Sequence, residues 1–273
     1  RTELARTDRT PVAVVATAGT TDHGAVDPLH DIADASVERG VWLHVDAAYG
    51  FGALFSERLR GLLDGVDRAD SVTLDLHKLG WLPAPASVLL VGDPAAFRST
   101  ERVVDYLIPE DDLDAGLAGL LGRSLQTTRR PDCLKVAAAL QAYGTSGLGE
   151  MVDRCHDLAL AAERAIAADP RLELVAGARL TTVLFRCVPP DGVDADAHQA
   201  RVRRALITSG RALVGRTRTA VGGAPATVLK LTLMNPGADA SDIAALLDLV
   251  AETGRRLADG ADMTGRVCQE ATA

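Results

Sequence analysis

In the N-terminal third of the chain, short runs of β-branched and apolar residues alternate with patterns of helical spacing. The runs predicted to be strands are Val12–Thr17, Trp42–Asp46, Ser71–Leu74 and Ser87–Val91. Helices are predicted over Leu29–Glu38, after the turn signal Asp27-Pro28, and over Glu57–Leu63. This alternation is typical of βαβ units, so we expect an α/β domain built on a mostly parallel sheet with helices on both faces.

The regular pattern stops between Arg98 and Arg130. This stretch contains the acidic cluster Glu110-Asp111-Asp112 and several glycines, and we expect a mobile loop over residues 99–128. Long loops in compact domains often act as lids over a functional site. Two helices are predicted to follow, at Asp132–Tyr143 and Leu148–Ala168.

The last part of the chain predicts a smaller α+β domain over residues 150–259, after a large domain over residues 1–149. Its expected elements are a strand at Thr181–Arg186, a helix at Asp194–Ser209, a strand at Thr227–Leu233 and a helix from Ser241 to Leu257. Ser241 is a good N-cap for the last helix. Residues 260–273 are expected to form a frayed tail.

Composition narrows the class of protein. With 47% hydrophobic residues the chain can bury a substantial core, and its net charge of −8 argues against nucleic acid or an anionic membrane as the main partner. No apolar run is long enough to span a bilayer, and no signal-peptide pattern opens the chain. The four cysteines have no C-x-x-C spacing, which favours free thiols in a cytoplasmic protein over a disulfide or a zinc site.

Candidate chemistry lies at the carboxyl ends of two predicted strands, where open α/β sheets bind their ligands. Asp46 ends one strand, and Lys78 follows the next strand 32 residues later. A pyridoxal 5'-phosphate (PLP) enzyme needs such a pair: the lysine amine condenses with the cofactor aldehyde, and the carboxylate keeps the pyridine nitrogen protonated. The first strand ends at the same edge, close to the turn at Gly19 and to Thr21.

Neighbouring residues strengthen this interpretation. His44 and Asp46 alternate along a strand and share a face, and the small Ala48 would let a flat ring lie close to the backbone. An isolated Val-Asp-Ala more often ends a strand and caps a helix, and a lone lysine after a strand is usually a solvated surface residue. The combination of Asp46, His44 and the Lys78 segment favours the cofactor.

Several segments resemble the group II PLP-dependent amino-acid decarboxylases, over about residues 11 to 255. The segments are VVATAGTTDHGAVDPL, WLHVDAAYG, ADSVTLDLHK, SLQTTRRPDCLK and LKLTLMNP. SLQTTRR, DYLIPEDD and TLMNP most resemble the L-2,4-diaminobutyrate decarboxylase branch. The resemblance implies the C-terminal part of a fold type I PLP-enzyme large domain followed by a small α+β domain, in a homodimer with its active site at the subunit interface.

By matched position, the resemblance implies that Lys78 forms the Schiff base with PLP and that Asp46 pairs with the pyridine nitrogen. The other implied contacts are Ala48 on the ring, Thr21 and His44 at its edge, and His77 near the phosphate. Each of these lesser residues also has a structural alternative. Thr21 could close the Gly19 turn, His44 could be a satisfied core histidine, and His77 could serve packing alone.

The chain departs from the family pattern at three places. Asp75 stands where members acting on aromatic amino acids carry asparagine, and a carboxylate repels a phosphate dianion, so we expect no direct phosphate contact from it. The tyrosine that those members use as a proton donor matches Leu120 here, and the only tyrosine of the predicted loop is Tyr106. Members also have a longer N-terminal part, which would hold a phosphate-binding turn and a ring-stacking histidine, so we expect that portion to be missing from this sequence.

The expected function is decarboxylation of an L-amino acid to an amine and carbon dioxide by a cytoplasmic carboxy-lyase. An aminotransferase or desulfurase of the same fold is the nearest alternative. A non-catalytic remnant, or a split-enzyme subunit that needs a separate N-terminal chain, is an alternative from another class. A hydrolase is poorly supported, because the chain has no G-x-S-x-G motif.

Overall fold

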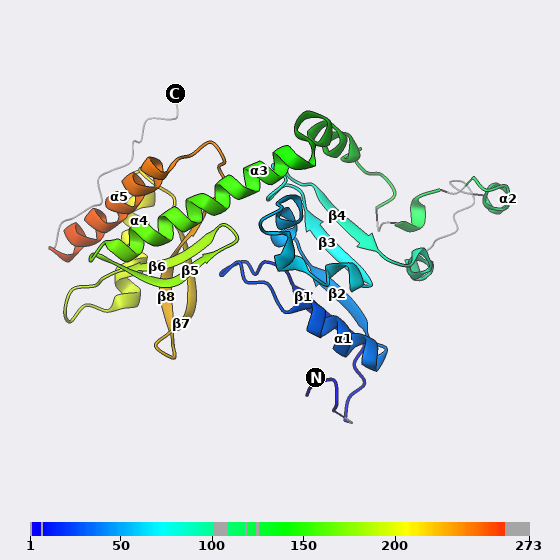
Figure 1. Ribbon diagram of the computed structural model, residues 1–273, viewed down its shortest axis with the longest axis horizontal. Helices are drawn as coiled ribbons and strands as arrows, with labels where there is room; N and C mark the ends of the chain where they lie inside the picture. Colours follow the sequence, from blue (N-terminus) through cyan, green and yellow to red (C-terminus); the bar gives the residue numbers. More distant parts are fainter. Residues whose placement is uncertain (1, 7, 101–108, 118, 124–125, 260–273) are drawn as a thin grey trace.

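The computed structural model describes residues 2–6, 8–100, 109–117, 119–123 and 126–259. These residues form two four-stranded sheets, and Figure 1 shows the long helix α3 (Cys133–Ala168) running from one sheet to the other. The predicted domain boundary between residues 149 and 150 falls within this helix. The division of the chain at that point therefore stays a prediction.

The first sheet has the strand order β1-β2-β3-β4. The strands are β1 (Ala13–Thr17), β2 (Trp42–Asp46), β3 (Ser71–Asp75) and β4 (Ser87–Val91). β1, β2 and β3 are parallel, whereas β4 runs antiparallel to β3. The predicted α/β fold with a mostly parallel sheet is confirmed, and the antiparallel strand β4 makes the sheet mixed.

One face of this sheet carries the core. Leu43 and Val45 are buried there against α1 (Leu29–Arg39) and the 3₁₀ helix η1 (Gly50–Phe55). The opposite face is open within the described residues: Val15 on β1 is 63% exposed and Leu89 on β4 is 53% exposed. The expected helices thus cover one face of the sheet here, and the cover on the other face stays a prediction.

The helix predicted over Glu57–Leu63 is wrong. The segment forms turns and the short 3₁₀ helices η2 (Arg60–Leu63) and η3 (Val66–Arg68). Ser56 Oγ accepts hydrogen bonds from the backbone of Arg58 and Leu59, and Gly61, which has a low helix propensity, lies within the segment. The segment therefore forms local turns instead of a continuous helix.

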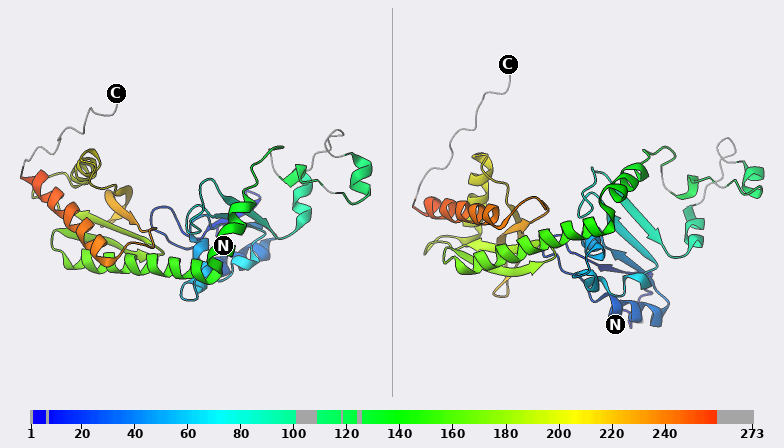
Figure 2. Two further views of the ribbon diagram at one scale, coloured as in Figure 1. Left: turned by 90° about the horizontal axis from the view of Figure 1, so that it is seen from above. Right: turned by 45° about the horizontal axis from the view of Figure 1, so that its top comes forward.

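The predicted mobile loop, residues 99–128, lies partly outside the described residues, which omit 101–108, 118 and 124–125. The described parts include η4 (Pro94–Thr100), α2 (Glu110–Asp114) and η5 (Leu121–Arg123). Figures 1 and 2 show α2 far from both sheets. Thr100 Oγ1 donates a hydrogen bond of 2.6 Å to the carbonyl of Gly122, which joins the two ends of the segment. The motion of this loop stays a prediction.

The two helices predicted at Asp132–Tyr143 and Leu148–Ala168 form the two arms of α3. Gly144 interrupts the helical geometry between them, with φ of 64° and ψ of 177°. Glycine tolerates this left-handed φ because it has no Cβ, so the kink lies where the sequence predicts a break.

The second sheet is antiparallel, with the order β5-β6-β8-β7. Its strands are β5 (Leu172–Arg179), β6 (Thr182–Cys187), β7 (Gly215–Val221) and β8 (Ala224–Thr232). A core forms between this sheet and α3, α4 (Ala195–Thr208) and α5 (Ala240–Ala258), and Figure 2 shows the same arrangement from two more sides. The small α+β unit is as expected, but the sequence predicted β6 and β8 and missed β5 and β7.

Both later helices begin at an aspartate. Asp194, the first residue of the helix predicted over Asp194–Ser209, caps α4 and accepts a hydrogen bond from the backbone of Ala197. Asp239 caps α5, and its carboxylate accepts from the backbone of Ser241 and Asp242. The prediction of Ser241 as the cap is wrong by two positions, because the aspartate side chain already reaches both amides. The predicted tail, residues 260–273, lies outside the described residues.

Candidate active site

The carboxyl ends of three parallel strands meet at one edge of the first sheet. Thr17 on β1, Asp46 on β2 and Thr73 on β3 are direct neighbours in the strand register. The loops that follow β1 and β2 also touch, since the amide of Gly50 donates a hydrogen bond of 2.9 Å to the carbonyl of Ala18. A Cβ on Gly50 would clash with that carbonyl oxygen, so this close approach requires glycine.

Asp46 lies in the middle of this edge. Its Oδ1 accepts a hydrogen bond of 3.0 Å from the backbone of Ala48, which fixes the direction of the carboxylate. Its second oxygen makes no hydrogen bond with the described part of the chain and is available to a ligand. Asp46 and Ala48 are half-buried, whereas Val45 and Ala47 are fully buried on the other face. The burial pattern therefore agrees with the predicted shared face of His44, Asp46 and Ala48.

His44 lies on the open face of the sheet and is held by two hydroxyl groups of β3. Its Nδ1 lies 2.8 Å from Ser71 Oγ, and its Nε2 lies 3.4 Å from Thr73 Oγ1. The imidazole is thus hydrogen-bonded, as the structural alternative requires, but it is half-buried rather than part of the core. Such a ring can present its exposed side to a flat ligand lying on this face.

Lys78 lies in the turn that follows β3. Its backbone amide donates to the carbonyl of Asp75 at 2.8 Å, and its Nζ forms a salt bridge of 2.8 Å with Asp75 Oδ2. The Lys78 side chain is 36% exposed, so the amine remains accessible. His77 turns the other way: its Nδ1 lies 3.0 Å from the carbonyl of Ala86, and its Nε2 is 3.8 Å from Asp75.

The pKa of Asp75 lies below the usual value of an aspartate. Burial by itself would raise the pKa of this carboxyl group, but hydrogen bonds from Lys78 and Ser87 lower it further than burial raises it. Ser87 Oγ on β4 donates to Asp75 Oδ1 at 2.5 Å. The carboxylate therefore stays ionised well below neutral pH and keeps a negative charge beside the lysine.

The sequence contains three lysines, and their surroundings differ. Lys135 Nζ donates to the carbonyls of Pro83 and Pro85 and forms a salt bridge with Asp132. The Lys230 side chain is 15% exposed, and its Nζ donates to the carbonyl of Thr21 and to Asp22. Both amines have structural partners on the backbone. Among the three, Lys78 alone combines a position at the strand edge with an amine bound to one carboxylate.

Thr21 lies at the same edge, on the loop after β1, and its side chain is exposed. The structural alternative for this residue is wrong, because Thr20 rather than Thr21 closes the turn at Gly19. Thr20 Oγ1 accepts a hydrogen bond of 3.1 Å from the backbone of Ala25. Thr21 instead holds the small domain through its carbonyl, as described for Lys230.

Residues that the sequence did not indicate connect this edge to the second sheet. The hydroxyl of Tyr49 lies 2.6 Å from Thr181 Oγ1 and 3.0 Å from Thr182 Oγ1. Burial raises the pKa of Tyr49 despite these hydrogen bonds, so the phenol stays neutral. The indole of Trp81, in the turn after Lys78, donates to the carbonyl of Met234 at 2.8 Å.

A signal for Tyr49 was present, since it directly follows Asp-Ala-Ala at the strand end, but its partners lie more than a hundred residues away. The described residues of the predicted loop do not assign a proton donor. Leu120 is 73% exposed, and Tyr106 lies outside the described residues.

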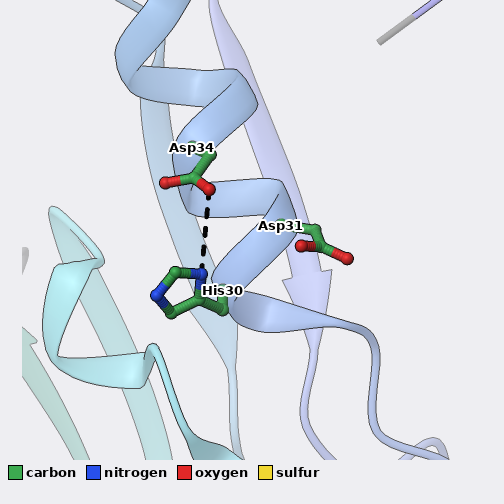
Figure 3. A group of neighbouring side chains, drawn as sticks. All are labelled: His30, Asp31 and Asp34. Atoms are coloured by element: carbon green, nitrogen blue, oxygen red, sulfur yellow. Dashed lines mark ion pairs between the residues drawn. The ribbon is translucent and has the colours of Figure 1, made fainter.

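A cluster of His30, Asp31 and Asp34 on α1 has the composition of a metal site, with ligand atoms within 4.8 Å of one another (Figure 3). His30 Nδ1 lies 3.7 Å from Asp34, and Arg68 forms a salt bridge of 2.7 Å with the same carboxylate. The arginine already supplies the cation that Asp34 attracts. The cluster also lies on the helix that covers the buried face of the sheet, away from His44 and Lys78.

Comparison with known proteins gives consistent matches. The model of the pyridoxal-dependent decarboxylase conserved domain matches residues 3–188. L-2,4-diaminobutyrate decarboxylase of Rhizobium meliloti is 44% identical over 250 residues, which is 91% of this chain and 50% of that protein. The chain thus spans about half the length of this curated relative.

Solved structures give the same result. The glutamate decarboxylase domain of a diaminobutyrate-pyruvate transaminase and L-2,4-diaminobutyrate decarboxylase from Vibrio parahaemolyticus superposes with a TM-score of 0.76 at 34% identity, covering 90% of this chain and 47% of that one. Oryza sativa TDC, solved with PLP and tryptamine, superposes with a TM-score of 0.81 at 28% identity, covering 90% and 51%.

The mixed sheet, its antiparallel last strand and the small antiparallel domain are therefore those of the fold type I PLP enzymes. The chain belongs to the pyridoxal-dependent decarboxylase family.

Proposed function

We propose that the protein carrying this chain is a PLP-dependent carboxy-lyase that converts an L-amino acid to its amine and carbon dioxide. The observation that carries the proposal is the placement of Asp46 and Lys78 at one edge of a parallel sheet, beside an open sheet face. A carboxylate and an accessible amine in this arrangement fit the two ends of a flat pyridine aldehyde. Family membership supports the same reading.

The chain's own residues would divide the work as follows. Lys78 Nζ would hold the cofactor covalently, and the Asp46 carboxylate would hold the proton on the pyridine nitrogen. When bound, the cofactor supplies a positively charged ring that accepts the electrons of the bond between Cα and the carboxylate group as that bond breaks. Ala48 would pack on the ring of the cofactor, His44 and Thr21 would line its edge, and His77 would lie near the phosphate.

The substrate to test first is L-2,4-diaminobutyrate. Two relatives with that name, from Rhizobium meliloti and Acinetobacter baumannii, match 91% and 90% of this chain. Human cysteine sulfinic acid decarboxylase, at 38% identity, matches 66% of it. The similarity to the relatives named for diaminobutyrate therefore extends through the small domain. The similarity to the relative named for cysteine sulfinic acid covers a smaller part of this chain.

We further propose that the protein acts as a homodimer in the cytoplasm. Leu134 and Leu140 on the first arm of α3 are exposed apolar residues that a partner subunit would cover. Cys133, Cys155 and Cys187 are free thiols, which fits a reducing compartment. In the part of the chain that the structure describes, no helix has the length and apolarity needed to cross a membrane. Light scattering of the purified protein would measure its mass in solution.

The decisive experiment traps the cofactor. The protein, expressed with all of its open reading frame, is incubated with PLP, reduced with borohydride and digested, and the modified peptide is identified by mass spectrometry. We expect the adduct on Lys78 and none in Lys78→Ala. An adduct on Lys135 or Lys230 in the parent protein would overturn the assignment.

Product analysis then separates the chemical alternatives. Release of carbon dioxide and 1,3-diaminopropane from L-2,4-diaminobutyrate supports the proposed reaction. A keto acid product would instead indicate an aminotransferase. A protein that binds no PLP would indicate the non-catalytic alternative.

A further inference from the structure

Asp75 has no part in the proposed division of roles, yet it is the group closest to the candidate lysine. Its Oδ2 lies 2.8 Å from Lys78 Nζ, and its Oδ1 accepts a hydrogen bond from the hydroxyl of Ser87 on the neighbouring strand. The carboxylate is thus held from both sides. Its side chain is 21% exposed, so the pair is partly shielded from water.

The backbone brings Asp75 and Lys78 together. Asp75 is the last residue of β3, and the turn that follows is closed by the hydrogen bond from the Lys78 amide to the Asp75 carbonyl. Two further hydrogen bonds hold the turn, from His77 N–H to the carbonyl of Ala86 and from Leu82 N–H to the carbonyl of Leu76. The conformation of this turn therefore places the Asp75 and Lys78 side chains next to each other, where they form the salt bridge.

The other polar groups near the pair do not replace Asp75. His77 Nε2 is 3.8 Å from Asp75, and its Nδ1 is directed at the backbone of Ala86. Asp46, on β2, has one oxygen bonded to Ala48. Ser87, on β4, is neutral and bonds to the carboxylate. Asp75 is thus the charged partner that the described residues offer to the Lys78 amine.

We infer that Asp75 is a positioning residue for Lys78: the Asp75 carboxylate holds the lysine amine at the sheet edge whenever no cofactor is bound to that amine. This inference rests on the proposed function, since it concerns the amine that would bind PLP. A neighbouring carboxylate favours the charged form of an amine over the neutral form. Only the neutral amine is a nucleophile, so Asp75 fixes the place of the lysine and restrains its reactivity.

The test measures the reactivity of each lysine without any cofactor. The PLP-free protein is treated with a trace of acetic anhydride from neutral to alkaline pH, and acetylation is quantified by mass spectrometry for Lys78, Lys135 and Lys230. In Asp75→Asn, which keeps the shape and removes the charge, we expect Lys78 to react roughly two to five times faster at neutral pH, as suits a partly exposed ion pair. Its pH profile should move to lower pH.

A matched control exists in the chain, because Asp132 pairs with Lys135 at the same sequence spacing, 3.0 Å apart. Asp132→Asn should leave the reactivity of Lys78 unchanged. If Asp75→Asn fails to fold, all three lysines become reactive together, and Ser87→Ala then takes its place. That variant loosens Asp75 without removing it, and a selective rise at Lys78 is expected.

An unchanged or lower rate at Lys78 in a folded Asp75→Asn protein would overturn the inference. The outcome is separable from that of the proposed function. Failure to trap PLP on Lys78 overturns the proposed function, whereas trapping on Lys78 with unchanged acetylation in Asp75→Asn overturns the inference about Asp75 alone.

Discussion

Asp46 offers one carboxylate oxygen to Ala48 and leaves the other for a ligand. Asp46→Asn should keep the hydrogen bond to Ala48 but lose the negative charge. Without that charge the pyridine nitrogen would not stay protonated, and we expect turnover of the cofactor-loaded enzyme to fall by about a hundredfold or more. Steady-state kinetics with unchanged far-ultraviolet circular dichroism would show the effect.

Asp31→Asn provides the control, since Asp31 lies on α1 away from the candidate site. Its turnover should match that of the parent protein. Near-parental activity in Asp46→Asn would contradict the role assigned to this carboxylate.

The cysteines give a second test on single residues. Burial raises the pKa of Cys155 to about 11 and that of Cys187 to about 12, whereas Cys133 is exposed. The thiolate is the nucleophile, so a raised pKa slows alkylation at neutral pH. Among these three described cysteines, we expect iodoacetamide to label Cys133 first and the other two only at alkaline pH or after unfolding. Peptide mapping over time would measure the order, and early labelling of Cys187 would contradict its burial.

At the scale of elements, the cap of α5 can be tested directly. The Asp239 carboxylate accepts hydrogen bonds from the backbone of Ser241 and Asp242, and the Asp242 carboxylate accepts one from the backbone N–H of Asp239. Asp239→Ala should lower the free energy of unfolding by about 1 kcal/mol, as removal of an N-cap does. Asp239→Asn keeps an acceptor at the cap and should cost much less. Urea unfolding of both variants would measure this, and equal losses would show that the cap has no role in stability.

The elements found from the sequence share strong local signals. The β-branched runs of β1 to β4 and the break at Gly144 are visible in the residues themselves. β7 was missed because it reads Gly-Arg-Thr-Arg-Thr-Ala-Val, with few apolar residues to indicate burial. Its turn signal, Gly222-Gly223, was available and would have predicted a hairpin.

For the candidate site, too, the sequence predicts what depends on local signals and not what depends on side-chain contacts. Asp46 and Lys78 each follow a strand in the sequence, and parallel strands bring their carboxyl ends to one edge. The contact between Lys78 and Asp75 depends on the conformation of a turn, and the hydroxyl partners of His44 depend on strand register. These interactions could not be predicted from the sequence, because the spacing of residues along the chain does not determine the direction of their side chains.

At the scale of the whole molecule, the site edge and the second sheet are joined by contacts between distant residues. Tyr49, three residues after Asp46, is buried with its hydroxyl between Thr181 and Thr182. Trp81 reaches Met234, and Lys230 reaches the loop at Thr21. The loops after β1, β2 and β3 thus each have a partner on the small domain, so the geometry of the site depends on how the two sheets are held together.

Tyr49→Phe tests this dependence with a change of one oxygen atom. The variant leaves the hydroxyls of Thr181 and Thr182 without their shared partner in a buried place, and we expect the free energy of unfolding to fall by about 1–3 kcal/mol. Tyr143→Phe is the matched control, because Tyr143 is 56% exposed and should lose almost nothing. Urea unfolding would compare the two. Equal losses would indicate that the buried hydroxyl does not stabilise the junction, whereas a selective loss in Tyr49→Phe, restored when Thr181 is also replaced by valine, would locate the stabilisation in this hydrogen bond between the two sheets.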